Sequence, residues 1–129
     1  MREILAGAPR SDNQIINAVT GGLPASALDD LLEAGLELAE IARVVGVSER
    51  TLQRKRGTAG TLDVAESDRT VRLARILAQA DRYIGEHGKA LRWLRTRNWA
   101  LGDRVPLDLL ATEPGVEMVR QSLVTIAYG

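Results

Sequence analysis

The sequence predicts an all-α protein with an N-terminal helix-turn-helix bundle, a long helix and a small helical domain at its C-terminal end. Apolar residues recur at helical spacing along most of the chain, and no segment of useful length alternates apolar and polar residues as a half-buried strand would. The 129 residues, 45% of them apolar, suffice for one domain or two small ones with a real core. Residues 57–62 have the composition of a linker, so the chain is predicted to divide into two parts, residues 1–60 and residues 61–129.

The first part of the chain is expected to form short helices. Residues 1–11 show no periodicity and are interpreted as a mobile arm. Asp12 is expected to cap the first helix, and Pro24 or Ser26 to open the second, which Gly35 ends.

Residues 36–56 have the arrangement of a helix-turn-helix unit. Ala42 is small enough for two helices to cross closely, and Gly46 permits the left-handed turn between them. Ser48 is a good N-cap for the second helix, and Leu52 falls on the inner face of that helix. The second helix is therefore interpreted as a recognition helix. Its predicted DNA-contacting residues are Ser48, Arg50, Thr51, Gln53, Arg54 and Arg56.

The outer face of this second helix carries side chains that bind base edges and phosphates. We expect Arg50 and Gln53 to read bases, and Arg54 and Arg56 to bind phosphate. Residues 47–60 hold four basic residues against one acidic residue, in a chain whose net charge is zero. One such helix reads too few base pairs alone, so a homodimer on operator DNA is expected. The alternative is a helical hairpin with a solvated basic face, kept only for packing.

Residues 64–84 are expected to form one long helix. Asp63 and Glu66 fit a capping box at its start, and its apolar residues follow helical spacing. Arg69 falls on the apolar stripe and needs a carboxylate or several carbonyls there. We expect Arg69 and Arg72 to form internal salt bridges rather than to contact a partner.

Both tryptophans of the chain follow this helix, and the chain has no phenylalanine. The single histidine, His87, lies in a bend and is interpreted as a turn residue or a helix cap. Residues 90–98 are predicted to form a short helix that ends at Asn98. Two further helices are predicted at residues 106–111 and 116–127, the first with a proline in its first turn.

The second half of the chain resembles a known family in several residues at fixed offsets. They are A-L-x-W-L from residue 90, Asn98, Leu101-Gly102, P-L-D-L-L from residue 106, Thr112, Gly115, Val119 and L-x-x-I-x-x-G from residue 123. This order is similar to the toxin-binding domain of the Xre/MbcA/ParS antitoxins, which act on RES-domain toxins. The segment that starts E-S-x-R at Glu66 also resembles this family. The resemblance covers residues 63–129 well and residues 12–56 more loosely.

This resemblance implies an antitoxin of a type II toxin–antitoxin system, which binds a cognate RES-domain toxin in a higher hetero-oligomer. Such a toxin uses NAD⁺, and the antitoxin's C-terminal region covers the toxin's NAD⁺ pocket. The helix-turn-helix unit is expected to repress the antitoxin's own operon. The predicted toxin-contacting residues are Trp93, Asn98, Trp99, Leu101, Pro106, Leu107, Arg120, Thr125 and Tyr128.

We expect one tryptophan in the core and the other at the toxin interface. Trp93 shares a helical face with apolar neighbours and is assigned to the core, whereas Trp99 lies at the helix stop and is assigned to the interface. Ser122, Thr125 and Tyr128 recur three residues apart. They are expected to share one face that hydrogen-bonds in or near the nucleotide pocket.

The composition disfavours an enzyme. The chain has no cysteine and one histidine, which excludes a thiol nucleophile and a multi-histidine metal site. No glycine-rich segment has the strand and the lysine of a phosphate loop. No catalytic residue, cofactor or metal is therefore expected. Because no membrane-spanning run and no signal segment is present, a cytoplasmic location is expected.

A plain helix-turn-helix transcription regulator, whose C-terminal half only dimerises, is the alternative function. A simple leucine-rich helix would satisfy such a module. The two tryptophans, the Asn-x-x-Leu-Gly turn and the Pro-Leu-Asp-Leu-Leu element instead predict an irregular surface that suits a different partner protein.

Overall fold

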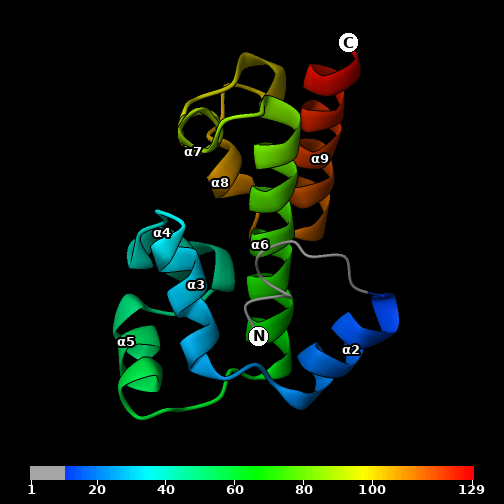
Figure 1. Ribbon diagram of the computed structural model, residues 1–129. Helices are drawn as coiled ribbons and strands as arrows, with labels where there is room; N and C mark the ends of the chain where they lie inside the picture. The colour runs from blue at the N-terminus through cyan, green and yellow to red at the C-terminus, as the bar shows by residue number, and fades with distance from the viewer. Residues whose placement is uncertain (1–10) are drawn as a thin grey trace.

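A computed structural model describes residues 11–129, and these residues form helices joined by short turns, so the all-α prediction is confirmed (Figure 1). The arm predicted for residues 1–11 lies, except for Ser11, outside the described residues. Among the described helices, none is long and apolar enough to cross a membrane. The helices are α2 (Asp12–Gly21), η1 (Ala25–Ala27), α3 (Leu28–Glu33), α4 (Leu38–Val45), α5 (Glu49–Gly57), α6 (Val64–Ile84), α7 (His87–Arg95), η2 (Trp99–Leu101), α8 (Pro106–Leu109) and α9 (Glu113–Tyr128).

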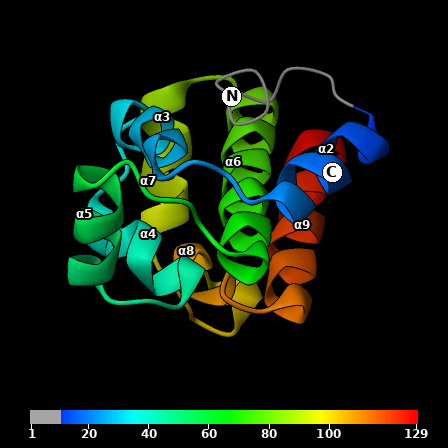
Figure 2. The same cartoon turned by 90° about the horizontal axis from the view of Figure 1, so that it is seen from below.

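The long helix α6 lies at the centre of the molecule. Helices α2 and α4 from the first half of the chain and helices α7 and α9 from the second half all pack against it (Figures 1 and 2). Its start and length agree with the prediction, because Asp63 and Glu66 form a capping box in which Glu66 N donates to Asp63 Oδ1 at 2.7 Å. A single apolar core extends from Leu23 to Leu123. Both halves of the chain therefore share α6, and the division at residue 60 stays a prediction.

The predicted linker at residues 57–62 is fixed to the body of the protein. Ala25 N donates to Gly60 O at 2.9 Å, and Leu62 N donates to Leu23 O at 2.8 Å. The side chain of Leu62 is buried in the core. The composition of this segment is that of a flexible loop, but these backbone bonds hold it in one place.

Several helix boundaries differ from the sequence prediction. Helix α2 is capped by Ser11 rather than Asp12. Ser11 Oγ accepts a hydrogen bond from Gln14 N, and Ser11 N donates one to Gln14 Oε1. Helix α7 begins at His87 and ends at Arg95. Helix α9 begins at Glu113, because Pro114 is compatible with the first turn of a helix and does not interrupt it.

The two arginines near the start of α6 both make contacts within the chain, but among the described residues only Arg72 forms the salt bridge that was expected for both. Arg72 pairs with Asp68 one turn earlier on the same helix. Arg69 Nη1 donates at 2.9 Å to the carbonyl of Val45, at the end of α4. Gly46 is needed beside it, because its φ of +86° is left-handed and a Cβ there would lie 2.7 Å from Arg69 Nη1.

Polar side chains of α7 bind to α4, to the turn between α3 and α4, and to α6. Arg95 forms a two-pronged ion pair with Glu40, with Nε–Oε2 and Nη2–Oε1 distances of 2.8 Å, and Arg95 Nη2 also donates to Gly35 O at 2.7 Å. The Arg95 guanidinium holds the pKa of the Glu40 carboxyl below its ordinary value, although burial opposes this. His87 contacts Ala34 O through Nε2 and Asp81 Oδ1 through Nδ1.

Replacing Arg95 should destabilise the fold. Arg95→Ala leaves the buried Glu40 without its partner, so the free energy of unfolding should fall by about 1.5–3 kcal/mol, the range for a hydrogen bond to a charged group. Urea denaturation measures this change. Arg92→Ala is the matched control, because Arg92 lies on the same helix with an exposed side chain. Equal effects of the two substitutions would contradict the structural role of the ion pair.

Stability should also depend on pH through His87. The acceptors Ala34 O and Asp81 Oδ1 raise the pKa of His87 above 6.5. A raised pKa gives stability that is fully present below the unfolded-state pKa and is lost as pH rises through the folded-state value. The stability difference between the wild type and His87→Gln should therefore be largest below about pH 6.5 and shrink as the pH rises above it. A difference that stays constant or grows with pH would contradict this assignment; His87 is the only histidine in the chain.

Candidate functional sites

Helices α4 and α5 form the predicted helix-turn-helix unit. Gly46 ends α4 in the left-handed conformation, and Ser48 caps α5 by accepting from Thr51 N at 3.0 Å. The Ser48 hydroxyl also donates to Thr51 Oγ1 at 2.8 Å. Leu52 is fully buried on the inner face of α5. Ser48 and Thr51 thus hydrogen-bond to each other at the start of α5, and these bonds fix the first turn of the predicted recognition helix.

Two basic residues fix α5 to neighbouring helices. Lys55 Nζ lies 2.6 Å from Glu66 Oε1 on α6, and Arg56 Nη2 lies 2.7 Å from Asp29 Oδ1 on α3. The Arg56 guanidinium is engaged by a carboxylate 27 residues earlier in the chain, and the binding of phosphate by Arg56 stays a prediction. The anchoring role of Lys55 was missed, since the sequence gives no local sign of a pair with Glu66.

The outer face of α5 remains open to solvent. Arg50, Gln53 and Arg54 are all exposed. In the described part of the chain, no ion pair engages either of the two arginines. This face can therefore offer two cations and one amide to a partner, which is the chemistry that binds phosphates and base edges.

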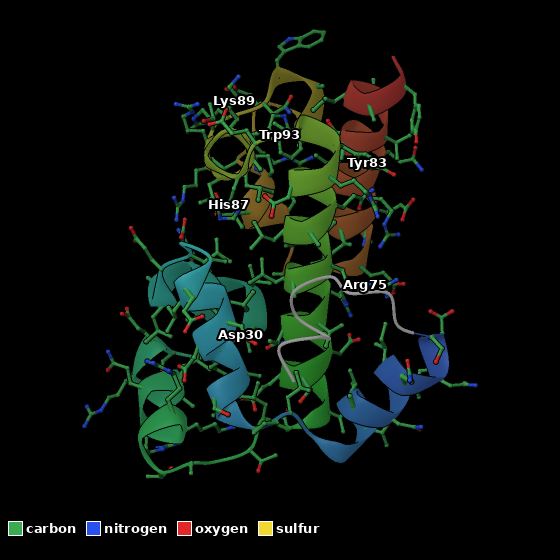
Figure 3. The ribbon with its side chains drawn as sticks, viewed as in Figure 1. Asp30, Arg75, Tyr83, His87, Lys89 and Trp93 are labelled. Carbon is green, nitrogen blue, oxygen red and sulfur yellow. The ribbon has the colours of Figure 1, made fainter. Side chains whose placement is uncertain are left out.

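A second candidate surface lies around Trp99. Its side chain is 89% exposed, as expected for an interface residue. Trp93 is half-buried and packs against the core, and in Figure 3 it lies beside the upper part of α6. Asn98 does not end α7; it caps the short η2 turn by accepting from Ala100 N at 2.9 Å.

Three predicted surface residues lie beneath this surface instead of on it. Leu101 is 3% exposed, and Pro106 and Leu107 are also buried. Their helices pack against α7, α9 and α4, which covers their side chains. These three residues therefore support the surface from below and cannot contact a partner directly in this conformation.

A shallow groove of about 380 Å³ lies between η2 and α9. Met118, which is partly exposed, Ser122 and Thr125 line its α9 side, and Ala100 lines its η2 side. Met118 was missed, although it lies four and seven residues before Ser122 and Thr125 and so shares their helical face. The groove is mostly apolar, with hydroxyl groups along one wall.

Ser122, Thr125 and Tyr128 were expected on one face of α9, but only Ser122 and Thr125 line the groove. Each three-residue step falls about 60° short of a full helical turn, so Tyr128 is rotated away from Ser122. The Tyr128 ring instead packs edge-on against Tyr83 of α6, with a centroid distance of 6.1 Å, and stays 80% exposed. Arg120 is exposed and pairs with Glu117 at 2.7 Å.

The apolar stripe of α9 continues beyond the part of the helix that is buried. Val116, Val119 and Leu123 are buried, and Ile126, the next residue at helical spacing, is 46% exposed. Ile126 was missed as a surface residue because its spacing matches the core. It adds apolar area to the end of α9 that carries Tyr128.

The two candidate surfaces lie far apart. Helix α5 lies at the lower left of Figure 1, whereas α9 ends at the top, and the view from below in Figure 2 again places α5 and α9 on opposite sides. No group of three or more acidic or histidine side chains within residues 11–129 could hold a metal ion. The side chains at the outer face of α5 and around Trp99 are therefore those of two binding surfaces.

Comparison with known proteins gives matches to both halves of the chain. Residues 14–75 match the antitoxin Xre-like helix-turn-helix domain, and residues 79–129 match the antitoxin Xre/MbcA/ParS C-terminal toxin-binding domain. An antitoxin Xre of Yersinia enterocolitica is 34% identical, over 99% of this chain and 87% of its own length. An antitoxin Xre of Pseudomonas putida is 36% identical, over 92% of this chain and 74% of its own length. A third antitoxin Xre, of Photorhabdus laumondii, is 29% identical over 95% of this chain and 85% of its own length.

Proposed function

The chain belongs to the Xre family of antitoxins, and on this basis we propose that it neutralises a RES-domain toxin by covering the toxin's NAD⁺ pocket. Antitoxin families of this kind are not enzyme families, so the activity is one of binding. We further propose that the chain represses its own operon as a homodimer through α5. The proposal of this toxin class and this pocket rests on the family resemblance in residues 63–129.

The exposure of Trp99 is the observation that supports toxin binding most strongly. A tryptophan that is 89% exposed leaves a large apolar area in water, and exposed aromatic residues next to grooves are typical anchors of protein interfaces. The groove between η2 and α9 can accept an apolar side chain of the toxin beside this anchor. Trp99 and the end of α9 therefore form one toxin-binding surface in our proposal.

The end of α9 is suited to enter a pocket. A single helix is about 10–12 Å wide, and its last turn carries the exposed residues Thr125, Ile126 and Tyr128. Nucleotide pockets are mostly apolar with a few polar groups. A helix end with both apolar and hydroxyl side chains can therefore occupy such a pocket and exclude NAD⁺.

The alternative, a plain transcription regulator, does not need this surface. A C-terminal half that only dimerises would bury its apolar residues in a symmetric helix pair. Copurification with the co-expressed neighbouring protein separates the two functions, because only the antitoxin forms a stable complex with that protein.

Truncation of Trp99 should weaken toxin binding. Trp99→Ala should lower the affinity about thirtyfold, which is about 2 kcal/mol, and should leave the unfolding free energy within about 0.5 kcal/mol of the wild type. Calorimetric titration with the cognate toxin measures the affinity. Ile16→Ala is the control, since Ile16 is 57% exposed on α2. Unchanged affinity of Trp99→Ala would refute the proposed surface.

Removal of the tail should separate binding from occlusion. Deletion of residues 125–129 removes the exposed last turn of α9 but leaves the buried Leu123 in place. Cells that express the toxin with this truncated chain should lose NAD⁺ and stop growing, while DNA binding stays largely intact. Full protection by the truncated chain would show that the pocket is not covered by α9.

DNA binding should depend on the open face of α5. Arg50→Ala should cost about 1–3 kcal/mol at the chain's own upstream region, and affinity should fall steeply with salt. Arg75→Ala is a control of equal charge, because Arg75 is exposed on α6 (Figure 3), away from α5. If the wild type shows no salt-dependent binding to this region, the repressor role is wrong.

A further inference from the structure

Three of the backbone hydrogen bonds that close the turn carrying Trp99 involve one residue, Asn98, and a fourth runs from Gly102 N to Trp99 O at 3.2 Å. The Asn98 carbonyl accepts from Leu101 N and from Asp103 N, both at 3.0 Å, and its N–H donates to Arg104 O at 3.0 Å. Its side-chain Oδ1 accepts from Ala100 N at 2.9 Å. Asn98 therefore makes four hydrogen bonds that together define the loop from residue 98 to residue 104.

The far side of the turn is equally constrained. Gly102 and Asp103 are consecutive residues with φ of +72° and +59°, which reverses the chain within two residues. Arg104 Nε donates to Leu101 O at 2.9 Å, and Arg97 Nη1 donates to Asp103 O at 3.0 Å. Leu101 is buried beneath the turn and fixes it to the core. Trp99 thus projects from a rigid, closed loop.

An exposed side chain needs such a loop if it is to be positioned. Trp99 is 89% exposed, so packing against the rest of the chain does little to hold its direction. Fixing a flexible backbone and side chain on binding costs entropy, and a loop that is already ordered avoids most of that cost. The geometry of η2 is therefore the main determinant of where the Trp99 ring points.

We propose that Asn98 is a positioning residue for the toxin interface: its side-chain oxygen caps η2 and holds Trp99 ready to bind, and Asn98 itself makes no essential contact with the toxin. This inference rests on the proposed function and replaces the direct contact that the sequence suggested for Asn98. Asn98 is half-buried, and its Oδ1 is already engaged by Ala100 N. The side chain thus acts inside the turn, one residue away from the anchor.

The mobility of Trp99 tests this role without any toxin. In a Trp93→Phe background, Trp99 is the only tryptophan, so time-resolved fluorescence anisotropy reports its motion alone. Asn98→Ala should increase the amplitude of nanosecond motion of Trp99, and Asn98→Asp, which keeps an acceptor oxygen at the cap, should leave it near the parent value. Gly102→Ala, which strains the left-handed residue at the other side of the turn, should increase the motion independently. Unchanged anisotropy in both Asn98→Ala and Gly102→Ala would overturn the proposal.

A double-mutant cycle tests whether Asn98 acts through Trp99. Asn98→Ala should weaken toxin binding about fivefold in the wild-type chain, which corresponds to about 1 kcal/mol, and less than twofold in the Trp99→Ala chain. Asn98→Asp should restore most of the affinity. Equal losses in both backgrounds would show that Asn98 contacts the toxin directly, which contradicts the proposal. If Trp99→Ala alone has no effect, the proposed interface is wrong, whereas the anisotropy result still decides whether Asn98 positions Trp99.

Discussion

The structure depends on the burial of α6 by helices from both halves of the chain. A helix of 21 residues is about 30 Å long, which is long enough for the helix-turn-helix unit to pack near one end and for the C-terminal helices to pack along the rest. Leu73, Ile76 and Leu77 are buried between these helices. Because the two halves share one core, the direction of α5 and the direction of the Trp99 surface are set by the same rigid element.

Polar contacts complete what apolar packing along α6 begins. The Arg95–Glu40 ion pair and the bonds of α7 to Ala34 O and Gly35 O prevent rotation of the C-terminal helices relative to α4. The Lys55–Glu66 and Arg56–Asp29 pairs do the same for α5. One side of the molecule therefore keeps a basic face open, and the other keeps an aromatic one, so that a bound toxin would leave α5 accessible to DNA.

Local signals were enough to predict most helices but only part of each surface. The capping box of α6, the turn at Gly46 and the cap at Ser48 involve neighbours within four residues, and all three were predicted correctly. Asn98 was placed at a helix end because asparagine favours both ends of helices. The burial of Leu101 and Leu107 and the pairs Arg56–Asp29 and Arg95–Glu40 depend on residues that are far away in the sequence, so no periodicity could reveal them.

Hydrogen–deuterium exchange of the chain, alone and bound to its toxin partner, tests the central claim most directly. The claim is that the toxin covers the Trp99 turn and the end of α9 and leaves the recognition helix uncovered. We expect slower exchange of backbone amides in residues 96–105 and in the last two turns of α9, with no change in α5. Slower exchange confined to α5, or no change around Trp99, would contradict the account.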